Sequence, residues 1–128
     1  MQKNIQKIAG GNVFLLMETE GYEKYYHRAF RCRAIRDALV VTSAIMRYRL
    51  EHDDLPEQLD QLIQAGYLNS LPADPFSGRS FVYRKADKDF LLYSLGPDFD
   101  DDGGTRSNRN DDVVNGDDVF WPVVDDQL

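Results

Sequence analysis

Apolar and polar side chains follow the period of an α-helix between residues 22 and 52. Apolar residues recur there at steps of three and four, which lines one face of a helix, and no Pro or Gly interrupts the run. The apolar face comprises Ala34, Ile35, Ala38, Val41, Ala44, Ile45 and Tyr48. The opposite face carries Arg33, Arg36, Arg47 and Glu51. We predict one helix over 22–52, about 45 Å long at about 1.5 Å per residue, which is long enough to project beyond its domain or to pack on a partner.

Residues 1–21 form an N-terminal extension in which the sequence predicts no firm element. Gly10, Gly11 and Asn12 break any helix, and Gly21 interrupts the chain again. The short apolar run over 13–17 fits either a short strand or a turn of helix packed on the core.

A second, shorter helix is expected after the first one stops. Pro56 cannot continue the long helix but suits the first turn of a new one. We therefore predict a short helix over 56–65, capped by Asp54 or Leu55 and ended by Gly66 in the position after its C-cap.

The second half of the chain is typical of a small antiparallel sheet. Two prolines and the pair Ser77-Gly78 predict a tight reversal within 71–78. Apolar runs separated by a polar turn predict a hairpin of strands 80–84 and 90–94, and 119–123 predicts a closing strand or extended edge. The fold class is therefore α+β: a long N-terminal helix whose apolar stripe packs on this sheet.

Composition and charge restrict the function. With 128 residues, 42% hydrophobic and 29% charged, the chain fits one globular domain, here placed over 22–128. The net charge of −7 argues against a nucleic-acid-binding role, which needs a basic face. Nine Lys and Arg against five Asp and Glu make the first 52 residues basic, whereas the remainder is strongly acidic. These halves are expected to attract each other, within one molecule or between neighbours.

Membrane spans, disulfides and catalysis are not indicated. The longest apolar run, over 13–17, is far shorter than the roughly 20 residues of a spanning helix, and no secretory signal with a cleavage site follows Lys3 and Lys7. The one cysteine, Cys32, excludes an intrachain disulfide, and we predict it to be a small buried helix residue. We predict no enzymatic activity, because Ser94 and His27 fall on different elements and no nucleophile elbow is present.

The segment with candidate metal ligands is the acidic stretch after the second predicted strand. From Asp98 to the C-terminus the chain holds ten aspartates, no glutamate and two arginines. Asp98, Asp100 and Asp102, followed by Gly103, match the first half of a calcium loop, in which alternate carboxylates converge on one ion. The second half does not match, because Arg109 stands where an EF-hand needs a bidentate glutamate.

Two interpretations of the acidic stretch stay open from the residues alone. In one, a calcium ion binds there, with later ligands drawn from Asp111, Asp112, Asp117 and Asp118. In the other, the stretch is a solvated, metal-free recognition segment over 98–126 in a larger bacterial protein, and it binds a basic partner.

Several spaced motifs occur in the order typical of one family. They are Leu55-Pro56, then Leu71-Pro72-Ala73-Asp74-Pro75-Phe76, then Phe81-Val82-Tyr83-Arg84, then Tyr93-Ser94-Leu95-Gly96-Pro97-Asp98, then Asp117-Asp118-Val119. In this order the chain resembles the G-type major pseudopilin of type II secretion systems over roughly residues 30–121, with Phe76 in place of the family's tryptophan.

The resemblance implies a pilin-like fold and a structural role in protein secretion. It implies a calcium site in the region 80–124, with Leu95 giving a backbone carbonyl and Asp98 and Asp117 or Asp118 giving carboxylates. An insert in this loop would let Asp100 and Asp102 replace or add ligands. The resemblance also implies other pseudopilin-like subunits as partners and a periplasmic or cell-envelope location. The family's hydrophobic N-terminal anchor is not among these residues, so attachment to a membrane would need an upstream segment.

Overall fold

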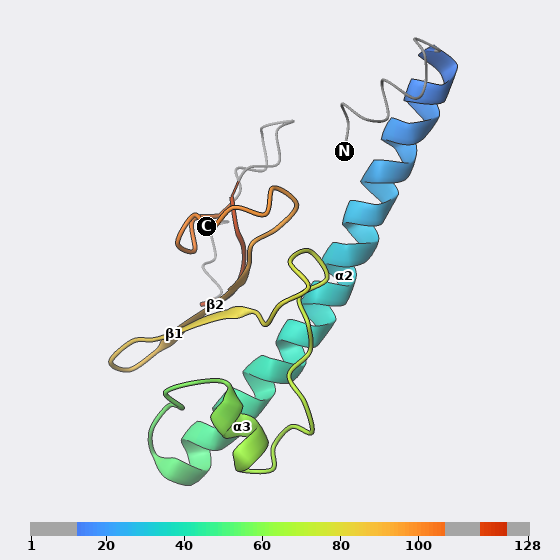
Figure 1. The fold of residues 1–128 in the computed structure, drawn as a ribbon. Helices are drawn as coiled ribbons and strands as arrows, with labels where there is room; N and C mark the ends of the chain where they lie inside the picture. Colours follow the sequence, from blue (N-terminus) through green and yellow to red (C-terminus); the bar gives the residue numbers. More distant parts are fainter. Residues whose placement is uncertain (1–12, 107–115, 123–128) are drawn as a thin grey trace, which may run out of the picture.

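The computed structural model describes residues 13–106 and 116–122. Within them the order of elements is a long helix, a short helix and three strands. The helix α2 runs from Val13 to His52, α3 from Asp60 to Gln64, β1 from Val82 to Lys85, β2 from Phe90 to Ser94 and β3 from Asp118 to Trp121. The predicted α+β class, with a long N-terminal helix on an antiparallel sheet, is confirmed (Figure 1).

The helix α2 begins nine residues before the predicted start at Tyr22. The predicted break at Gly21 is therefore wrong, and of the two alternatives for 13–17 the structure shows the helix and not the strand. A single Gly in a helix interior costs only about 1 kcal/mol relative to Ala, which forty residues of continuous hydrogen bonding tolerate. The predicted C-terminal end of the helix at residue 52 is confirmed. Asp53, the next residue, has a left-handed φ of 56°, and its backbone N–H donates to the carbonyl of Arg49.

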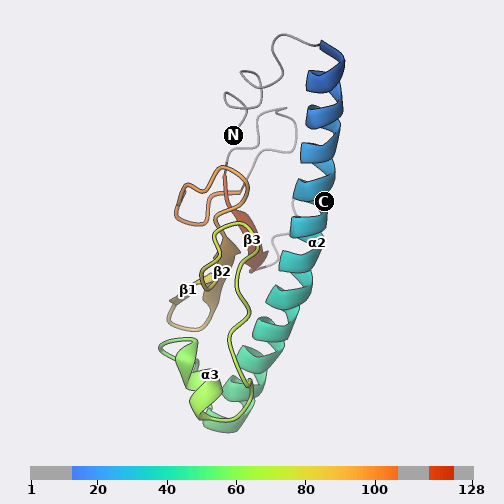
Figure 2. The same cartoon turned by 45° about the vertical axis from the view of Figure 1, so that its right-hand side comes forward.

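The predicted apolar face of α2 forms one wall of the core. Ala34, Ala38, Val41 and Ile45 are at most 2% exposed and pack in one cluster with residues of the sheet and of α3. Ile35 departs from the prediction, because it lies outside this stripe and is 45% exposed. Figures 1 and 2 show the sheet along the C-terminal half of α2, while the N-terminal part of the helix projects past it.

The helix α3 is shorter than the predicted 56–65. Its first turn is replaced by a non-helical segment in which the backbone N–H groups of Glu57 and Gln58 donate to the side-chain oxygen of Gln61. The predicted caps Asp54 and Leu55 are wrong, because the helix begins after Leu59 without a side-chain cap. The predicted end is confirmed by Gly66, which has a φ of 78° just after Ala65.

The three strands form one antiparallel sheet in the order β1-β2-β3. The predicted hairpin is confirmed, and β2 has the predicted bounds of 90–94, while β1 and β3 differ from their predicted ranges by one or two residues at each end. An irregularity between Leu92 and Tyr93 shifts the register of β2 against β3. No helix of the described residues is long and apolar enough to pass through a bilayer.

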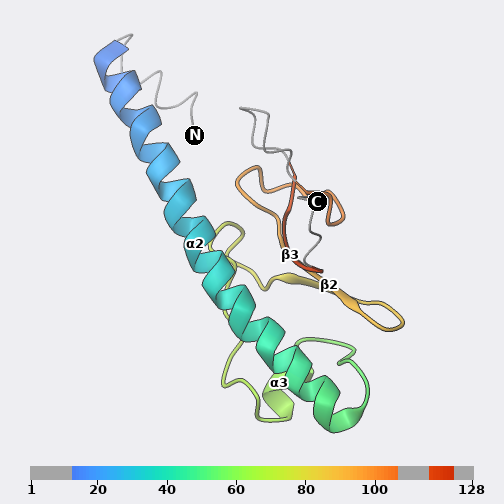
Figure 3. The same ribbon diagram turned by 180° about the vertical axis from the view of Figure 1, so that it is seen from behind.

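The acidic loop after β2 lies at the end of the sheet remote from α3. Figure 3 shows it from behind, with α3 at the lower end of the molecule and the loop above the sheet. The chain leaves β2 at Ser94, runs through the loop and returns as β3 beside β2, with Ser94 opposite Asp118. This return places the two ends of the loop next to each other.

Candidate metal centre in the C-terminal acidic loop

The entry and the exit of the loop touch at Gly96. This residue has a φ of 71°, and an added Cβ would lie 3.1 Å from the carbonyl oxygen of Gly116. A side chain there would have to push the two backbone segments apart. The glycine therefore lets residues 95–98 and 116–118 lie against each other.

The Asp98 side chain stabilises the contact between residues 95–98 and 116–118. One carboxylate oxygen, Oδ2, accepts the backbone N–H of Gly116 at 2.9 Å, and the other, Oδ1, accepts the N–H of Asp100 at 3.3 Å. The predicted ligand Asp98 therefore lies beside the residue that precedes Asp117. The structure thus brings together the two ends of the acidic loop, from which the sequence predicts calcium ligands.

Asp117 is the most unusual group of the loop. Its side chain is 1% exposed, and Oδ2 accepts the backbone N–H of Gly104 at 2.7 Å. Its other oxygen, Oδ1, is buried and has no hydrogen-bond partner among the described residues. Burial raises the pKa of the Asp117 carboxyl above its ordinary value, although the backbone amides of Gly104 and Asp102 oppose the shift. A buried carboxylate with one unpaired oxygen is a costly arrangement unless a positive group completes it.

The turn at Gly104 holds the amide that faces Asp117. Gly104 has a φ of 84°, and an added Cβ would lie 2.6 Å from the Cδ2 atom of Leu91 on β2. The backbone N–H of Asp117 donates in return to the carbonyl of Thr105 at 2.8 Å. The turn at Gly104 and Thr105 therefore bonds to both the side chain and the backbone of Asp117.

The other predicted ligands lie around this centre in different settings. Asp100 and Asp102 are exposed, and the carbonyl of Asp102 accepts two hydrogen bonds from Thr105. Leu95 follows β2 and is half-buried. The Asp118 carboxylate forms an ion pair with Arg31 of α2 at 3.1 Å. Two further candidates of the sequence, at positions 111 and 112, lie outside the described residues.

Sequence reasoning missed two residues that shape the loop. Tyr93 of β2 is fully buried, and its hydroxyl donates to Asp101 at 2.7 Å. Arg31 reaches the same region from α2. Both contacts depend on the register of β2 and on how α2 crosses β3, and neither is written in the local sequence. The position of Tyr93 just before the Ser94-Leu95-Gly96 motif was the only available signal.

The Asp117 segment is thus bonded to the turn at Gly104 and Thr105, and Gly116 beside it is bonded to Asp98. In the parts of the chain that the structure describes, no three His, Cys, Asp or Glu side chains gather as a metal-binding group. The donor set for a hard cation would combine carboxylates with backbone carbonyls, as calcium sites often do. The buried, unpartnered Oδ1 of Asp117 fits such an ion.

Two further residues of α2, Cys32 and His27, were considered in the sequence analysis. Cys32 was predicted to be buried, and this is wrong, because it is exposed and lies away from the buried stripe of Ala34 and Ala38. His27 is half-buried, and its ring lies edge-on to Phe76 with the ring centres 6.4 Å apart, which agrees with a packing role.

The sequence was compared with known proteins at two levels. No family model matches the chain, and no curated protein matches it either.

Proposed function

We propose that the chain is a non-enzymatic, pseudopilin-like structural and assembly domain, related to type II protein secretion, whose C-terminal loop is held by calcium. The proposed calcium site is supported above all by the buried Asp117 carboxylate. Its Oδ1 atom has no hydrogen-bond partner among the described residues. A divalent cation would neutralise this carboxylate and offset the repulsion among its acidic neighbours.

The proposed ligands are those that the resemblance and the sequence imply. Asp117 and Asp98 would supply carboxylate oxygens and Leu95 a backbone carbonyl, because the contacts of Gly96 and Gly116 bring their segments together. Asp100, Asp102 and Asp118 are the additional ligands that the sequence predicts. Calcium suits this set better than magnesium because it accepts six to eight oxygens in flexible geometry.

The assembly role is supported by the surface of α2. Figure 2 shows the N-terminal part of this helix beyond the sheet. Tyr22, Tyr25 and Tyr26 on this part are each more than 60% exposed. A row of exposed aromatic side chains is typical of a surface that other subunits cover. By resemblance, the domain would work in the periplasm or cell envelope, attached through a segment outside this sequence.

The metal-free acidic module is supported less well. Asp100 and Asp102 are exposed, yet Asp117 is buried, Asp118 pairs with Arg31, and Asp101 accepts a hydrogen bond from Tyr93. A segment that binds a basic partner through its carboxylates would not bury the Asp117 carboxylate.

Thermal unfolding with calcium and with a chelator tests the proposal. Calcium is expected to raise the melting temperature of the wild type, because a ligand that binds only the folded state stabilises by mass action, about 2.7 kcal/mol at a hundred times its Kd. Asp117→Asn keeps the shape of the side chain and an oxygen for Gly104, but removes the charge. This variant is expected to melt at the same temperature with and without calcium.

Asp87→Asn is the matched control, since Asp87 is an exposed aspartate in the turn between β1 and β2. It is expected to keep the full calcium response. Equal melting temperatures of the wild type in calcium and in chelator would remove the metal from the proposal, and an undiminished response of Asp117→Asn would remove Asp117 as a ligand.

A further inference from the structure

Asp117 and Asp118 are neighbours in the chain, but their side chains bind to different elements. The Asp117 carboxylate accepts the backbone N–H of Gly104 in the acidic loop at 2.7 Å, whereas the Asp118 carboxylate pairs with Arg31 of α2 at 3.1 Å. Asp118 begins β3, and successive residues of a strand point to opposite sides of the sheet. Figure 2 shows β3 lying beside α2. The start of β3 therefore has one side toward the loop and one toward the helix.

The two carboxylates differ in the oxygen atoms that they leave for an ion. Arg31 binds both oxygens of Asp118, with Nη2 3.1 Å from Oδ1 and Nε 3.2 Å from Oδ2. A two-contact pair of this kind neutralises the carboxylate and fixes its geometry. Asp117 uses only Oδ2, and its Oδ1 atom is buried without a hydrogen-bond partner among the described residues. Asp117 is therefore the carboxylate available to a cation, whereas Asp118 is occupied by α2.

The backbone on both sides of Asp117 is held as well. The N–H of Gly116 donates to the Asp98 carboxylate at 2.9 Å, and the N–H of Asp117 donates to the carbonyl of Thr105 at 2.8 Å. One peptide bond separates Asp117 from Asp118, which holds the helix. A cation that fixes the Asp117 side chain therefore also restricts the position of Asp118, and the ion pair at Asp118 restricts Asp117 in return.

Arg31 lies at an informative place on α2. The buried stripe of the helix starts one turn later, at Ala34. Toward the N-terminus, Tyr25 and Tyr26 are 73% and 62% exposed. The ion pair with Asp118 thus holds α2 near the point where its packed part passes into its exposed part.

We infer that Arg31 is a positioning residue of the proposed calcium site, which acts through Asp118, and that of the two neighbouring aspartates only Asp117 is a ligand. Calcium binding at Asp117 and attachment of α2 at Asp118 then strengthen each other, because coupling between two sites is reciprocal. This deepens the proposed function, on which it rests, by giving the adjacent aspartates different roles. It also connects the calcium-held loop to the helix that carries the exposed tyrosines.

Isothermal titration calorimetry of the full 128-residue chain with calcium chloride, well below the melting temperature, tests the coupling. The variant combines Arg31→Met with Asp118→Asn, which removes the ion pair and keeps the net charge of −7. The general attraction of the chain for a cation is therefore retained. Calcium affinity is expected to fall by about three- to fivefold, because the coupling cannot exceed what a partly exposed ion pair contributes. A role confined to the stability of the fold would leave the affinity of the folded molecules unchanged.

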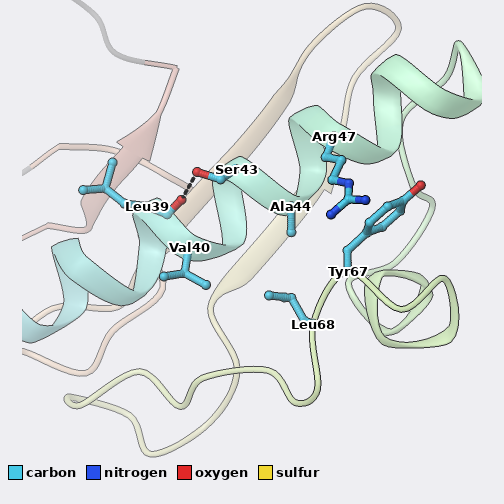
Figure 4. A pocket seen from close by; sticks show the side chains of 7 residues that line it. All are labelled: Leu39, Val40, Ser43, Ala44, Arg47, Tyr67 and Leu68. Carbon is cyan, nitrogen blue, oxygen red and sulfur yellow. Dashed lines mark hydrogen bonds between the residues drawn. The ribbon is translucent and has the colours of Figure 1, made fainter.

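The matched control removes another ion pair of α2, by combining Arg47→Met with Glu51→Gln. The Nε atom of Arg47 lies 3.2 Å from Oε1 of Glu51. Figure 4 shows Arg47 beside the ring of Tyr67, which follows α3 and is thus remote from the acidic loop. This control also keeps the net charge and should bind calcium like the wild type. Asp117→Asn alone is expected to abolish measurable binding.

Hydrogen exchange gives a second readout, from the side of the helix. In the wild type, calcium is expected to slow amide exchange in peptides covering residues 25–35 by about three- to fivefold, the reciprocal of the effect on affinity. The variant without Arg31 and Asp118 should lose this slowing, whereas the control variant should keep it. Where the first variant is unfolded at the titration temperature, Arg31→Lys takes its place. Lysine keeps the charge but not the two-contact geometry, so an affinity about twofold weaker is expected.

Two results in the variant without Arg31 and Asp118 would overturn the inference. An unchanged calcium affinity would show that the ion pair does not position the site. A complete loss of binding would show that Asp118 is itself a ligand. A wild type that binds no calcium would overturn the proposed function and this inference with it. Because the first two results require a wild type that binds calcium, the two failures are distinguishable.

Discussion

Arg31 on α2 and Asp118 on β3 form a two-contact ion pair across 87 positions of the sequence. The Nη2 atom lies 3.1 Å from Oδ1 and the Nε atom 3.2 Å from Oδ2. The Asp118 side chain is 15% exposed and the Arg31 side chain 46%. Because Asp118 directly follows Asp117, this pair fixes the strand that carries the candidate metal centre against the long helix.

Arg31→Met is expected to lower the free energy of unfolding by about 0.5–1 kcal/mol, the upper range for a partly exposed pair. The aliphatic part of the side chain is kept, and only the charge is lost. Urea unfolding of the wild type and variant measures the difference, which should shrink in high salt. Arg28→Met, an exposed change one turn earlier on α2, is the control. Equal losses from both variants would show that the pair contributes nothing beyond the general charge of the helix.

Asp74 joins the reversal before the sheet to the end of β2. It is 1% exposed and accepts three hydrogen bonds: from the backbone N–H of Phe76 at 3.0 Å, from the hydroxyl of Ser77 at 3.1 Å and from the hydroxyl of Ser94 at 2.7 Å. Asp74→Ala would leave all three donors without this acceptor, so we expect a loss of at least about 3 kcal/mol in urea unfolding. Asp87→Ala, at an exposed position, should cost less than about 0.5 kcal/mol. A comparably small loss for Asp74→Ala would mean that water replaces its bonds.

The parts of the fold that the sequence predicted are those set by local patterns. The bounds of β2, the reversal at Ser77-Gly78 and the left-handed Gly66 after α3 follow from apolar runs and turn residues within a few positions. The start of α2 was missed for the opposite reason. Gly21 is a local breaker, and its modest cost is outweighed by the helix on both sides of it.

For the candidate site, the sequence indicated which residues could take part but not how they are arranged. The alternation of Asp98, Asp100 and Asp102 indicated a hard cation, yet it did not separate the buried Asp117 from the ion-paired Asp118. That difference arises from the register of β3 against β2 and from the approach of α2. These long-range relationships leave no trace in the spacing of neighbouring residues.

Gly104 is expected to be less replaceable than its neighbour Gly103. Both have a positive φ, 84° and 69°, so alanine strains the backbone at either position by about 1–2 kcal/mol. Only at Gly104 would the new Cβ meet another side chain, the Cδ2 atom of Leu91 at 2.6 Å. Gly104→Ala should therefore destabilise the domain more than Gly103→Ala in urea unfolding.

A double-mutant cycle with Leu91→Ala isolates this contact. In that background the space next to Gly104 is empty, so the two alanine variants should become equally costly. If Gly104→Ala keeps its extra cost without the Leu91 side chain, the clash is not its cause, and the position of the Gly104 amide against Asp117 would explain the difference.

The raised pKa of the buried Tyr93 hydroxyl predicts how the stability of the domain changes at alkaline pH. Burial, and then the hydrogen bond to Asp101, raise the pKa of the Tyr93 hydroxyl from 10.0 to about 12. The folded state thus keeps this proton when the unfolded chain has released it. The stabilisation is complete below pH 10 and is lost as the pH rises through about 12. Burial likewise raises the pKa of Tyr83, whose hydroxyl donates to the carbonyl of Pro56, to about 12.

Tyr93→Phe is expected to cost about 1 kcal/mol at neutral pH, because the hydroxyl loses its bond to Asp101. Above pH 10 the wild type should lose stability more steeply than the variant, so the two unfolding curves converge as the pH rises. Tyr83→Phe should flatten the curve by a similar amount, and the double variant by both. Tyr25→Phe, at an exposed position, is the control and should follow the wild type. A difference between wild type and Tyr93→Phe that stays constant from pH 8 to 12 would contradict the raised pKa, because it would show that the hydroxyl loses its proton equally readily in both states.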